Sequence, residues 1–163
     1  MSEILTRRVA DSALETSYLV LPEHTNAMGN IFGGTVMAWI DMLAACISLR
    51  HCRTQVVTAS MDDLHFINPI KLGDLVILRG SVNYTGRTSM EVGIKVMAEN
   101  PFTGLQLHTS SAYLTFVALD ADGKPMLVPT IVPESVIEKR RFNDGRTRRD
   151  FRIERKKSLS GKL

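Results

Sequence analysis

The sequence predicts one α+β domain in which a single long helix is wrapped by a curved antiparallel sheet of about five to six strands. The length of 163 residues is that of one ordinary domain. One long apolar segment, from Gly34 to about Leu49, lacks strand-like alternation and predicts the helix. Four long strand-like segments follow it with only short turns between them, which favours an antiparallel meander.

The chain before the helix predicts a strand and a loop. Residues 16–21 are rich in β-forming side chains and stop at Pro22, and residues 22–34 are rich in Gly, Asn and small residues. The helix segment that follows is rich in Ala, Leu and Met, which have high helix propensity. It is apolar almost all round, so we expect most of its surface to be enclosed.

The strands after the helix are long and end at turns that contain Gly or Pro. Every second residue from 90 to 96 is hydrophobic, and the residues between them include Glu91 and Lys95. Such alternation is expected of a sheet with one buried and one solvated face. The buried face can therefore enclose the apolar helix. The four predicted strands are residues 55–67, 75–85, 88–99 and 106–119.

Positive charge is concentrated in the last part of the sequence. Residues 1–138 carry 9 Lys or Arg and 14 Asp or Glu, whereas residues 139–163 carry 11 and 3. The second segment has also lost strand periodicity and most of its hydrophobic residues, and Pro129 and Pro133 precede it. We therefore expect a domain over residues 1–138, followed by a basic C-terminal tail or surface helix over residues 139–163.

Composition argues against several classes of protein. No segment is long and apolar enough to cross a membrane, and the N-terminus is too polar for a signal peptide, so we expect a cytoplasmic protein without a membrane partner. Cys46 and Cys52 are expected to be free thiols, because their spacing suits no disulfide. No His or Cys spacing typical of a metal site occurs, so we expect neither a metal nor a cofactor.

Asp41 is the only formally charged residue between Glu23 and Arg50, and it lies in the middle of the apolar helix. A carboxylate without a local partner in such a position costs free energy or has a raised pKa. One explanation is structural: Asp41 faces a solvated gap, caps a neighbouring backbone or pairs across a subunit interface. The other is catalytic, because general-base and nucleophilic chemistry need a carboxylate of this kind.

The segment that enters the helix is suited to binding a developing negative charge. Gly33 and Gly34 leave backbone N–H groups unpaired at the positive end of the helix dipole, and no side chain blocks close approach. Asn30 adds an amide that can donate to a carbonyl or orient a water. Together they could stabilise an oxyanion. The alternative is a flexible turn whose glycines serve the packing of the helix against the sheet.

Several separated motifs resemble those of one family. The segment HTNAMGNIFGG at residues 24–34, followed by Trp39-Ile40-Asp41, closely resembles the signature of hot-dog-fold acyl-CoA thioesterases of the cytosolic acyl-CoA hydrolase type. Three later segments are similar as well, and the resemblance runs from about residue 15 to residue 135. They are residues 62–74, GRTSMEV at residues 86–92, and AYLTFVALD at residues 112–120 with Gly123-Lys124-Pro125.

The resemblance implies a hot-dog fold and the hydrolysis of fatty acyl-CoA to free fatty acid and CoA. It implies that Asp41 attacks the thioester carbonyl or activates the attacking water, and that Asn30 supports the reacting groups. It also implies a homo-oligomer in which dimers with shared sites form a trimer of dimers. Backbone donors of Gly33 and Gly34 would then hold the oxyanion, which is an inference from the geometry of the helix entry and not from the resemblance. Coenzyme A enters only as part of the substrate.

The phosphates of coenzyme A need cationic side chains together with hydroxyl or backbone donors. Two parts of the sequence offer them, a turn before a strand and the basic tail. The alternatives are a simple polar turn and a solvated charged helix. The candidates are Arg87, Thr88 and Ser89 in the turn, and Arg140, Arg141, Arg148 and Arg149 in the tail.

Three other functions are consistent with parts of the sequence. One is another hot-dog enzyme, a dehydratase or hydratase acting on acyl thioesters. The pattern of such enzymes has a catalytic histidine paired with an acid on the helix, and this chain has Asn30 at the loop position. Another is a nucleic-acid binding module, but the basic tail has only Phe142 and Phe151 for stacking on bases, so we expect no nucleic acid partner. The third is a non-catalytic acyl-CoA sensor, which would bind its ligand without turnover.

Overall fold

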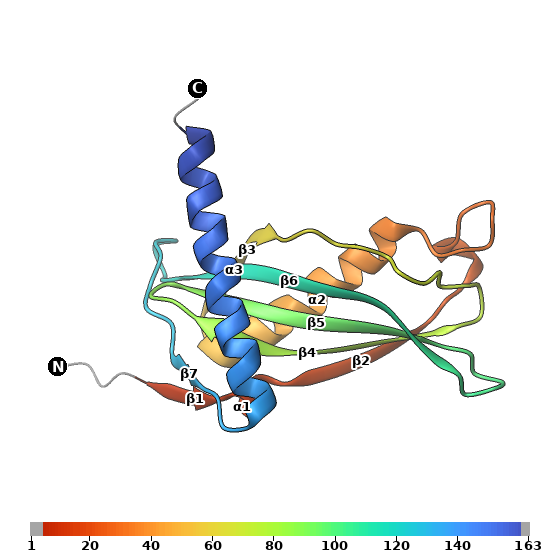
Figure 1. The fold of residues 1–163 in the computed structure, drawn as a ribbon, viewed down its shortest axis with the longest axis horizontal. Coiled ribbons are helices and arrows are strands. Elements are labelled where there is room, and N and C mark those ends of the chain that lie inside the picture. Colours follow the sequence, from red (N-terminus) through yellow and green to blue (C-terminus); the bar gives the residue numbers. More distant parts are fainter. Residues whose placement is uncertain (1–4, 161–163) are drawn as a thin grey trace.

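The computed structural model describes residues 5–160, in which a five-stranded antiparallel sheet curves around one long helix, α2 (Gly33–Cys52) (Figure 1). This is the hot-dog arrangement, so the predicted fold is confirmed. The strand order is β2-β4-β5-β6-β3, which leaves β2 and β3 at the two edges. The strands are β2 (Leu14–Leu19), β3 (Gln55–Met61), β4 (Leu75–Thr85), β5 (Ser89–Glu99) and β6 (Gln106–Leu119).

The central strands lie where the sequence predicts them, but β3 is shorter than expected. Its pairing with β6 shifts register between Thr58 and Ser60 and ends at Met61. Residues 62–69 form no strand, although the N–H groups of Asp62 and Ile67 still donate to the carbonyls of Tyr113 and Thr109 of β6 at 2.9 Å. The predicted strand over residues 55–67 is therefore too long by six residues. The first predicted strand, 16–21, lies two residues earlier in the structure.

Three short elements that the sequence did not predict close one end of the molecule. They are β1 (Thr6–Arg8), α1 (Val9–Ser12) and β7 (Thr130–Val132). β1 and β7 form a small parallel sheet of their own. Each element has only three or four residues, so no periodicity could reveal it.

The core lies between α2 and the concave face of the sheet. In α2, Val36, Ile40, Ala44 and Ile47 are fully buried, at the spacing that puts side chains on one face of a helix. Other parts of its surface are uncovered: Met37, Met42 and Leu49 are 44%, 59% and 46% exposed. The expectation that most of the helix surface is enclosed is therefore wrong for a single chain.

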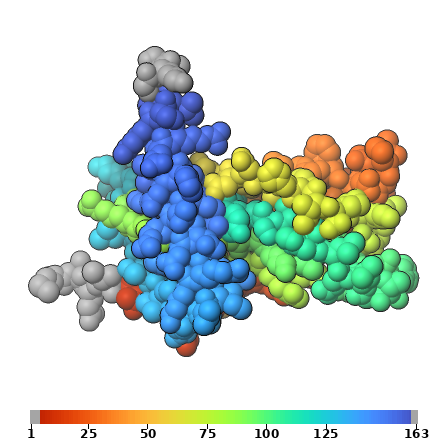
Figure 2. Space-filling model, in the orientation of Figure 1, coloured from red at the N-terminus to blue at the C-terminus, as the bar shows by residue number. Residues whose placement is uncertain are grey.

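The segment that the sequence predicts as a basic tail or surface helix forms α3 (Val136–Ser160), which starts three residues before residue 139. It crosses the convex face of the sheet and extends beyond the strands (Figures 1 and 2). Residues 161–163 of the predicted segment lie outside the described residues. Because α3 covers part of the convex face, the sheet has two buried faces at this crossing. Glu91, predicted on a solvated face, is only 1% exposed.

Within the described residues, no helix combines the length and the hydropathy that crossing a membrane requires.

Candidate active site

Asp41 projects from the middle of α2 beside the edge strand β3. Thr58 of β3 donates a hydrogen bond from Oγ1 to Oδ1 of Asp41 at 2.8 Å. Asp41 is half-buried and forms no ion pair with any residue in the range 5–160. Its carboxylate is therefore held by a neutral hydroxyl, and Thr58 is a site residue that the sequence analysis missed.

The surface around Asp41 is apolar and uncovered. On α2, the exposed Met37 and Met42 lie one turn before and one residue after Asp41, and Cys46 is exposed one turn further on. A carboxylate that opens on an uncovered apolar surface of this kind is typical of a site at an interface or in a binding groove.

The entry to α2 presents backbone donors, as the sequence predicts. Phe32 occupies the N-cap position but provides no side-chain hydrogen bond. The N–H of Thr35 donates to the carbonyl of Phe32 at 2.9 Å, and no side chain caps the N–H groups of Gly33 and Gly34. A Cβ on Gly34 would lie 2.6 Å from Cε1 of the Phe32 ring. Glycine at position 34 therefore has two effects: it leaves room for the Phe32 ring, and it leaves no side chain in front of the N–H groups at the helix entry.

Asn30 belongs to a tight turn that it shares with Asn26. The backbone N–H of Asn26 donates to the carbonyl of Asn30 at 2.9 Å, and Oδ1 of Asn26 accepts N–H groups from Met28 at 2.9 Å and from Asn30 at 3.3 Å. Gly29 has a φ of +73°, a conformation that glycine adopts without strain. The Asn26 side-chain oxygen is thus occupied, and its amide N–H groups remain available as donors.

His24 and Trp39 fasten the loop before this turn to the helix. Nδ1 of His24 accepts the backbone N–H of Leu21 at 3.1 Å, and its ring stands edge-on to Trp39 at 5.1 Å between centroids. The other face of Trp39 stacks on Tyr18 at 4.3 Å. His24 is therefore occupied in packing the loop.

The helix entry and Asp41 are far apart within one chain. Gly33 precedes Asp41 by eight residues on a continuous helix, which corresponds to about 12 Å along the axis. A developing oxyanion must lie within about 3 Å of its donors. The N–H of Gly33 and the carboxylate of one and the same chain are therefore too far apart to act on one carbonyl group.

The seven residues predicted to bind CoA phosphates lie on two sides of α3. On one side, Arg149 approaches the turn between β4 and β5, since a Cβ on Gly86 would lie 3.4 Å from Nε of Arg149. Ser89 and Arg149 share a cavity of about 760 Å³ there, with Ala59 and Ser60 of β3 in its wall. Arg87 and Thr88 precede Ser89 in the same turn. Arg140, Arg141 and Arg148 line a different cavity.

Arg148 is already occupied by a buried carboxylate. Its guanidinium binds Oε1 of Glu91 at 2.7 Å and lies over the Tyr113 ring at 3.6 Å from the centroid. Arg152 binds the other oxygen of Glu91 at 3.2 Å and also binds Asp62 at 2.6 Å. These residues form one ion-pair network that attaches α3 to β5 and to the end of β3. Nothing in the local sequence of Glu91 indicated such partners.

Comparison with known proteins places this geometry in a family. The thioesterase superfamily model matches residues 28–103. An uncharacterized acyl-CoA thioester hydrolase of Bacillus subtilis is 41% identical over 152 residues, which make up 93% of this chain and 88% of that protein. This chain belongs to the thioesterase superfamily.

Two solved structures share the whole fold of this thioesterase. One is a hexameric acyl-CoA thioesterase without ligand, 41% identical with a TM-score of 0.90 over 93% of this chain and 97% of that one. The other is an acyl-CoA hydrolase of Staphylococcus aureus in complex with butyryl-CoA, CoA and CoA disulfide. It is 37% identical with a TM-score of 0.85 over 95% of this chain and 97% of that one. The resemblance inferred from the motifs is thus confirmed.

Proposed function

We propose that this thioesterase hydrolyses fatty acyl-CoA to free fatty acid and CoA, with Asp41 as the catalytic carboxylate. The observation that carries the proposal is the hydrogen bond from Thr58 to Asp41, which orients a carboxylate toward an uncovered apolar surface. An acyl chain suits such a surface, and the oriented carboxylate suits the thioester. The CoA ligands of the Staphylococcus aureus structure support the same class of substrate.

As a general base, Asp41 would take a proton from water while the water oxygen forms a bond to the thioester carbon. The carbonyl oxygen then carries the negative charge until the C–S bond breaks and CoA leaves as a thiolate. A thiolate is a good leaving group, with a pKa of about 8.5 by analogy with cysteine. The proton held by Asp41 returns to the thiolate or to solvent. As a nucleophile, Asp41 would itself bond to the carbon, and water would hydrolyse the resulting anhydride.

The oxyanion would be held by backbone N–H groups of Gly33 and Gly34, with Asn30 in the same turn as a supporting residue. Because those glycines are about 12 Å along the helix from Asp41 of their own chain, we assign them to Asp41 of a second protomer. The exposed edge β3 and the uncovered face of α2 are the surfaces available for that protomer. We expect dimers of this kind to assemble further, as in the hexameric relative.

Asn26 is a second candidate for the side-chain donor. Three further structures of the Staphylococcus aureus enzyme carry alanine in place of an aspartate, of a threonine that follows it by 17 positions, and of an asparagine that precedes it by 15. Thr58 follows Asp41 by 17 positions, and Asn26 has the corresponding place before it. We propose that Asn26 donates from Nδ2 while Asn30 closes the turn that aims it.

For the phosphates of CoA, we propose the cavity beside the β4–β5 turn, with Arg87, Thr88, Ser89 and Arg149. Its wall includes Ser60 of β3, two residues after Thr58, so it adjoins the strand that holds Asp41. Arg148 has its charge taken up by Glu91, and Arg140 and Arg141 face elsewhere. Of the residues predicted in the tail, Arg149 is thus the one best placed for this role.

The deciding experiment is thiol release from a panel of acyl-CoA esters from two to eighteen carbons. Asp41→Asn should lower turnover at least about a hundredfold, the lower end for losing a general base, while CoA still binds. Asp122→Asn, an exposed acid far along the chain, is the matched control and should behave as the wild type. Turnover by Asp41→Asn close to that of the wild type would refute the assignment.

A nucleophilic role of Asp41 can be detected by single turnover in ¹⁸O-labelled water with enzyme in excess. A nucleophilic carboxylate acquires ¹⁸O when its anhydride is hydrolysed at the aspartyl carbon, whereas a general base acquires none. Mass spectrometry of the peptide that contains Asp41 reads the outcome.

A further inference from the structure

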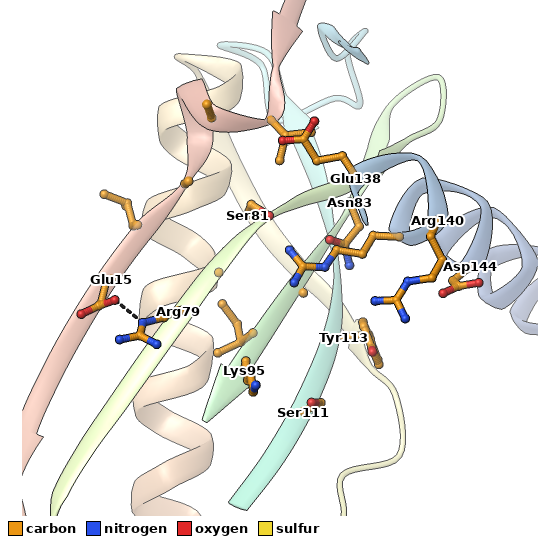
Figure 3. Close-up of a pocket in the computed structure, with 18 of the residues that line it drawn as sticks. Glu15, Arg79, Ser81, Asn83, Lys95, Ser111, Tyr113, Glu138, Arg140 and Asp144 are labelled. Carbon is orange, nitrogen blue, oxygen red and sulfur yellow. Dashed lines mark hydrogen bonds and ion pairs between the residues drawn. The ribbon is translucent and has the colours of Figure 1, made fainter. Parts of the chain in front are cut away.

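A second cavity lies on the face of the sheet that is turned away from Asp41. It has a volume of about 1020 Å³ and lies between α3 on one side and α1 with β2 on the other (Figure 3). Its floor is formed by the middle of β4, β5 and β6. On β5, Gly93, Ile94 and Lys95 line this cavity, and the Ile94 side chain is also part of the buried core that packs against α2. The sheet therefore separates the cavity from Asp41 of the same chain.

The cavity collects cations without ion-pair partners. Lys95 comes from the floor, and Arg140 and Arg141 come from α3 on the opposite wall. Within residues 5–160, none of the three has a carboxylate oxygen within 4.0 Å. Figure 3 shows Lys95 and Arg140 on two sides of the same space. All three side chains are exposed, and together they give the walls and floor of the cavity a positive surface that attracts anions.

The carboxylates that face the cavity are fewer than its cations and two of them are already engaged. Glu15 pairs with Arg79 at the rim. Glu138 accepts the backbone N–H groups of Glu134 and Ser135 at 2.7 and 2.9 Å, and these bonds lower its pKa. Asp144 is the third. Arg148 also lines the cavity, but Glu91 takes up its charge. The other lining cations are Arg79, Lys95, Arg140 and Arg141, so positive charge exceeds negative by one.

The floor adds neutral donors between these charges. Ser81 of β4 and Ser111 of β6 line it, and Figure 3 shows both on the strands of the floor. The Ser111 hydroxyl is 2.9 Å from Nε2 of His108, which also lines the cavity. Hydroxyl groups together with guanidinium and ammonium groups form the donor set that binds phosphate oxygens. A volume near 1000 Å³ is at the upper end for small-molecule sites and would accommodate a nucleotide.

We propose that this cavity is a second binding site, specific for a small organic phosphate that carries a diphosphate group. The same chemistry occurs in a free nucleotide such as ADP and in the nucleotide half of CoA, so the two sources must be distinguished by experiment. The site is independent of the proposed function, because its residues lie across the sheet from Asp41 and share no side chain with the thioester site.

The test is calorimetric titration of the full chain with inorganic pyrophosphate, ADP and CoA at constant ionic strength. Arg140→Gln/Arg141→Gln should weaken pyrophosphate binding at least about tenfold, since each charge-assisted contact contributes that order of affinity. Lys139→Gln/Arg146→Gln is the matched control, because it removes the same charge from exposed positions of α3 that line neither cavity. The control should bind pyrophosphate like the wild type.

The remaining arms identify the ligand. Tighter binding of ADP than of citrate, with both dependent on Arg140 and Arg141, supports a phosphate site, whereas equal binding of citrate contradicts it. Equal loss in the pocket variant and the control variant would show general charge attraction and refute the site. If ADP or CoA binding depends on Arg149 but not on Arg140 and Arg141, the anion belongs to the substrate cavity and the proposal is wrong.

Two further controls keep failure of this proposal apart from failure of the proposed function. Asp41→Asn should bind pyrophosphate like the wild type, whatever its turnover. Sedimentation of the pocket variant should show the oligomeric state of the wild type. If the pocket variant has a different oligomeric state and the wild type binds no pyrophosphate, another protomer fills the cavity and the proposal is wrong.

Discussion

Thr58 holds the carboxylate of Asp41 without neutralising it. A cation in the same place would stabilise the ionised form and reduce its basicity, whereas a hydroxyl donates one hydrogen bond and leaves the second oxygen open. The contact occupies Oδ1, so Oδ2 is the atom available to water or to the thioester carbon. Thr58 of β3 therefore contributes by orienting Oδ2 of Asp41 on α2.

Replacing Thr58 with valine keeps the shape of the side chain and removes the donor. We expect turnover to fall by about tenfold or more, because a hydrogen bond to a charged group contributes about 1.5–3 kcal/mol. The Michaelis constant should change little. Thr58→Ser retains the hydroxyl and should restore most of the rate in a steady-state assay. Equal loss in both variants would mean that the methyl group, rather than the hydrogen bond, is required.

His51 at the end of α2 makes stability depend on pH. It is fully buried, and Nε2 donates to the carbonyl of Pro129 at 2.8 Å, since a carbonyl can only accept. Nδ1 has no partner among the described residues, so a second proton would be buried without an acceptor. Burial therefore lowers the pKa of His51 below its usual value.

The lowered pKa predicts loss of stability in acid. The unfolded chain binds a proton at His51 below about pH 6.5, while the folded chain resists it, so the free energy of unfolding should fall as the pH falls below that value. Urea unfolding at pH 7.5 and pH 5.5 measures the change. His51→Gln can still donate to Pro129 and has no imidazole to titrate, so the fall between the two pH values should be smaller. An identical fall would assign the effect to other groups.

Among the elements, α3 is part of the folded domain and not an appendage. Glu91 is buried beneath it and is compensated by Arg148 and Arg152, both of which come from α3. Removing one side of such a network leaves a buried charge without a partner, which costs several kcal/mol. Close approach of the helix depends on Gly145, whose missing Cβ would lie 3.0 Å from both Glu91 Oε1 and Tyr84 Cβ.

A side chain at position 145 should therefore lift α3 from the sheet. We expect Gly145→Val to lower the free energy of unfolding by about 1–3 kcal/mol, the usual cost of overpacking. Arg146→Val places the same side chain at the exposed neighbouring position without the clash. Valine has a higher helix propensity than glycine, so a loss of stability in Gly145→Val cannot come from propensity. Thermal or urea unfolding of the two variants gives the comparison. Equal stability would show that α3 adjusts to the added side chain.

Sequence periodicity predicted the central elements because they are long and each follows one rule. β4 and β6 have the predicted bounds, and α2 was recognisable from its apolar composition. The alternation in β5 correctly predicted which residues share a face of the sheet, but not that the face with Glu91 is buried. Nothing near Glu91 in the sequence indicates that a helix more than forty residues later covers it. β1, α1 and β7 are too short to produce a pattern.

The candidate site was predictable only in part, for a similar reason. Asp41 was conspicuous as a single charge in an apolar helix, and its neighbours in the sequence sufficed to select it. Thr58 is one of several β-forming residues in its segment, and only the register of β3 brings its hydroxyl to Asp41. Asn26 and Asn30 lie in one turn, and their sequence gave no means of distinguishing the roles of the two side chains.

At the scale of the whole molecule, the proposed mechanism assigns to one chain two halves of different sites. Its helix entry and its Asp41 are about 12 Å apart along α2, so in this proposal each half acts with the complementary half of another protomer. The uncovered apolar residues of α2 and the exposed edge β3 provide a surface that a partner would cover. Activity is then expected to require association.

Complementation between inactive variants tests this arrangement. In a mixed dimer of Asp41→Ala and Asn26→Ala protomers, one shared site carries both changes and the other carries neither. Coexpression with random pairing should therefore restore about one quarter of wild-type activity. Sites contained within single chains would give none. Repeating the mixture with Asn30→Ala in place of Asn26→Ala shows whether Asn30 itself is required for turnover.

The burial of Glu91 also imposes an order on folding. Arg148 and Arg152 follow Glu91 by 57 and 61 positions, so during synthesis the carboxylate leaves the ribosome well before the cations that compensate it. Until Arg148 and Arg152 are synthesised, the Glu91 carboxylate of β5 must remain in contact with water, so the convex face of the sheet stays solvated. Final closure of this thioesterase therefore waits for the second half of α3.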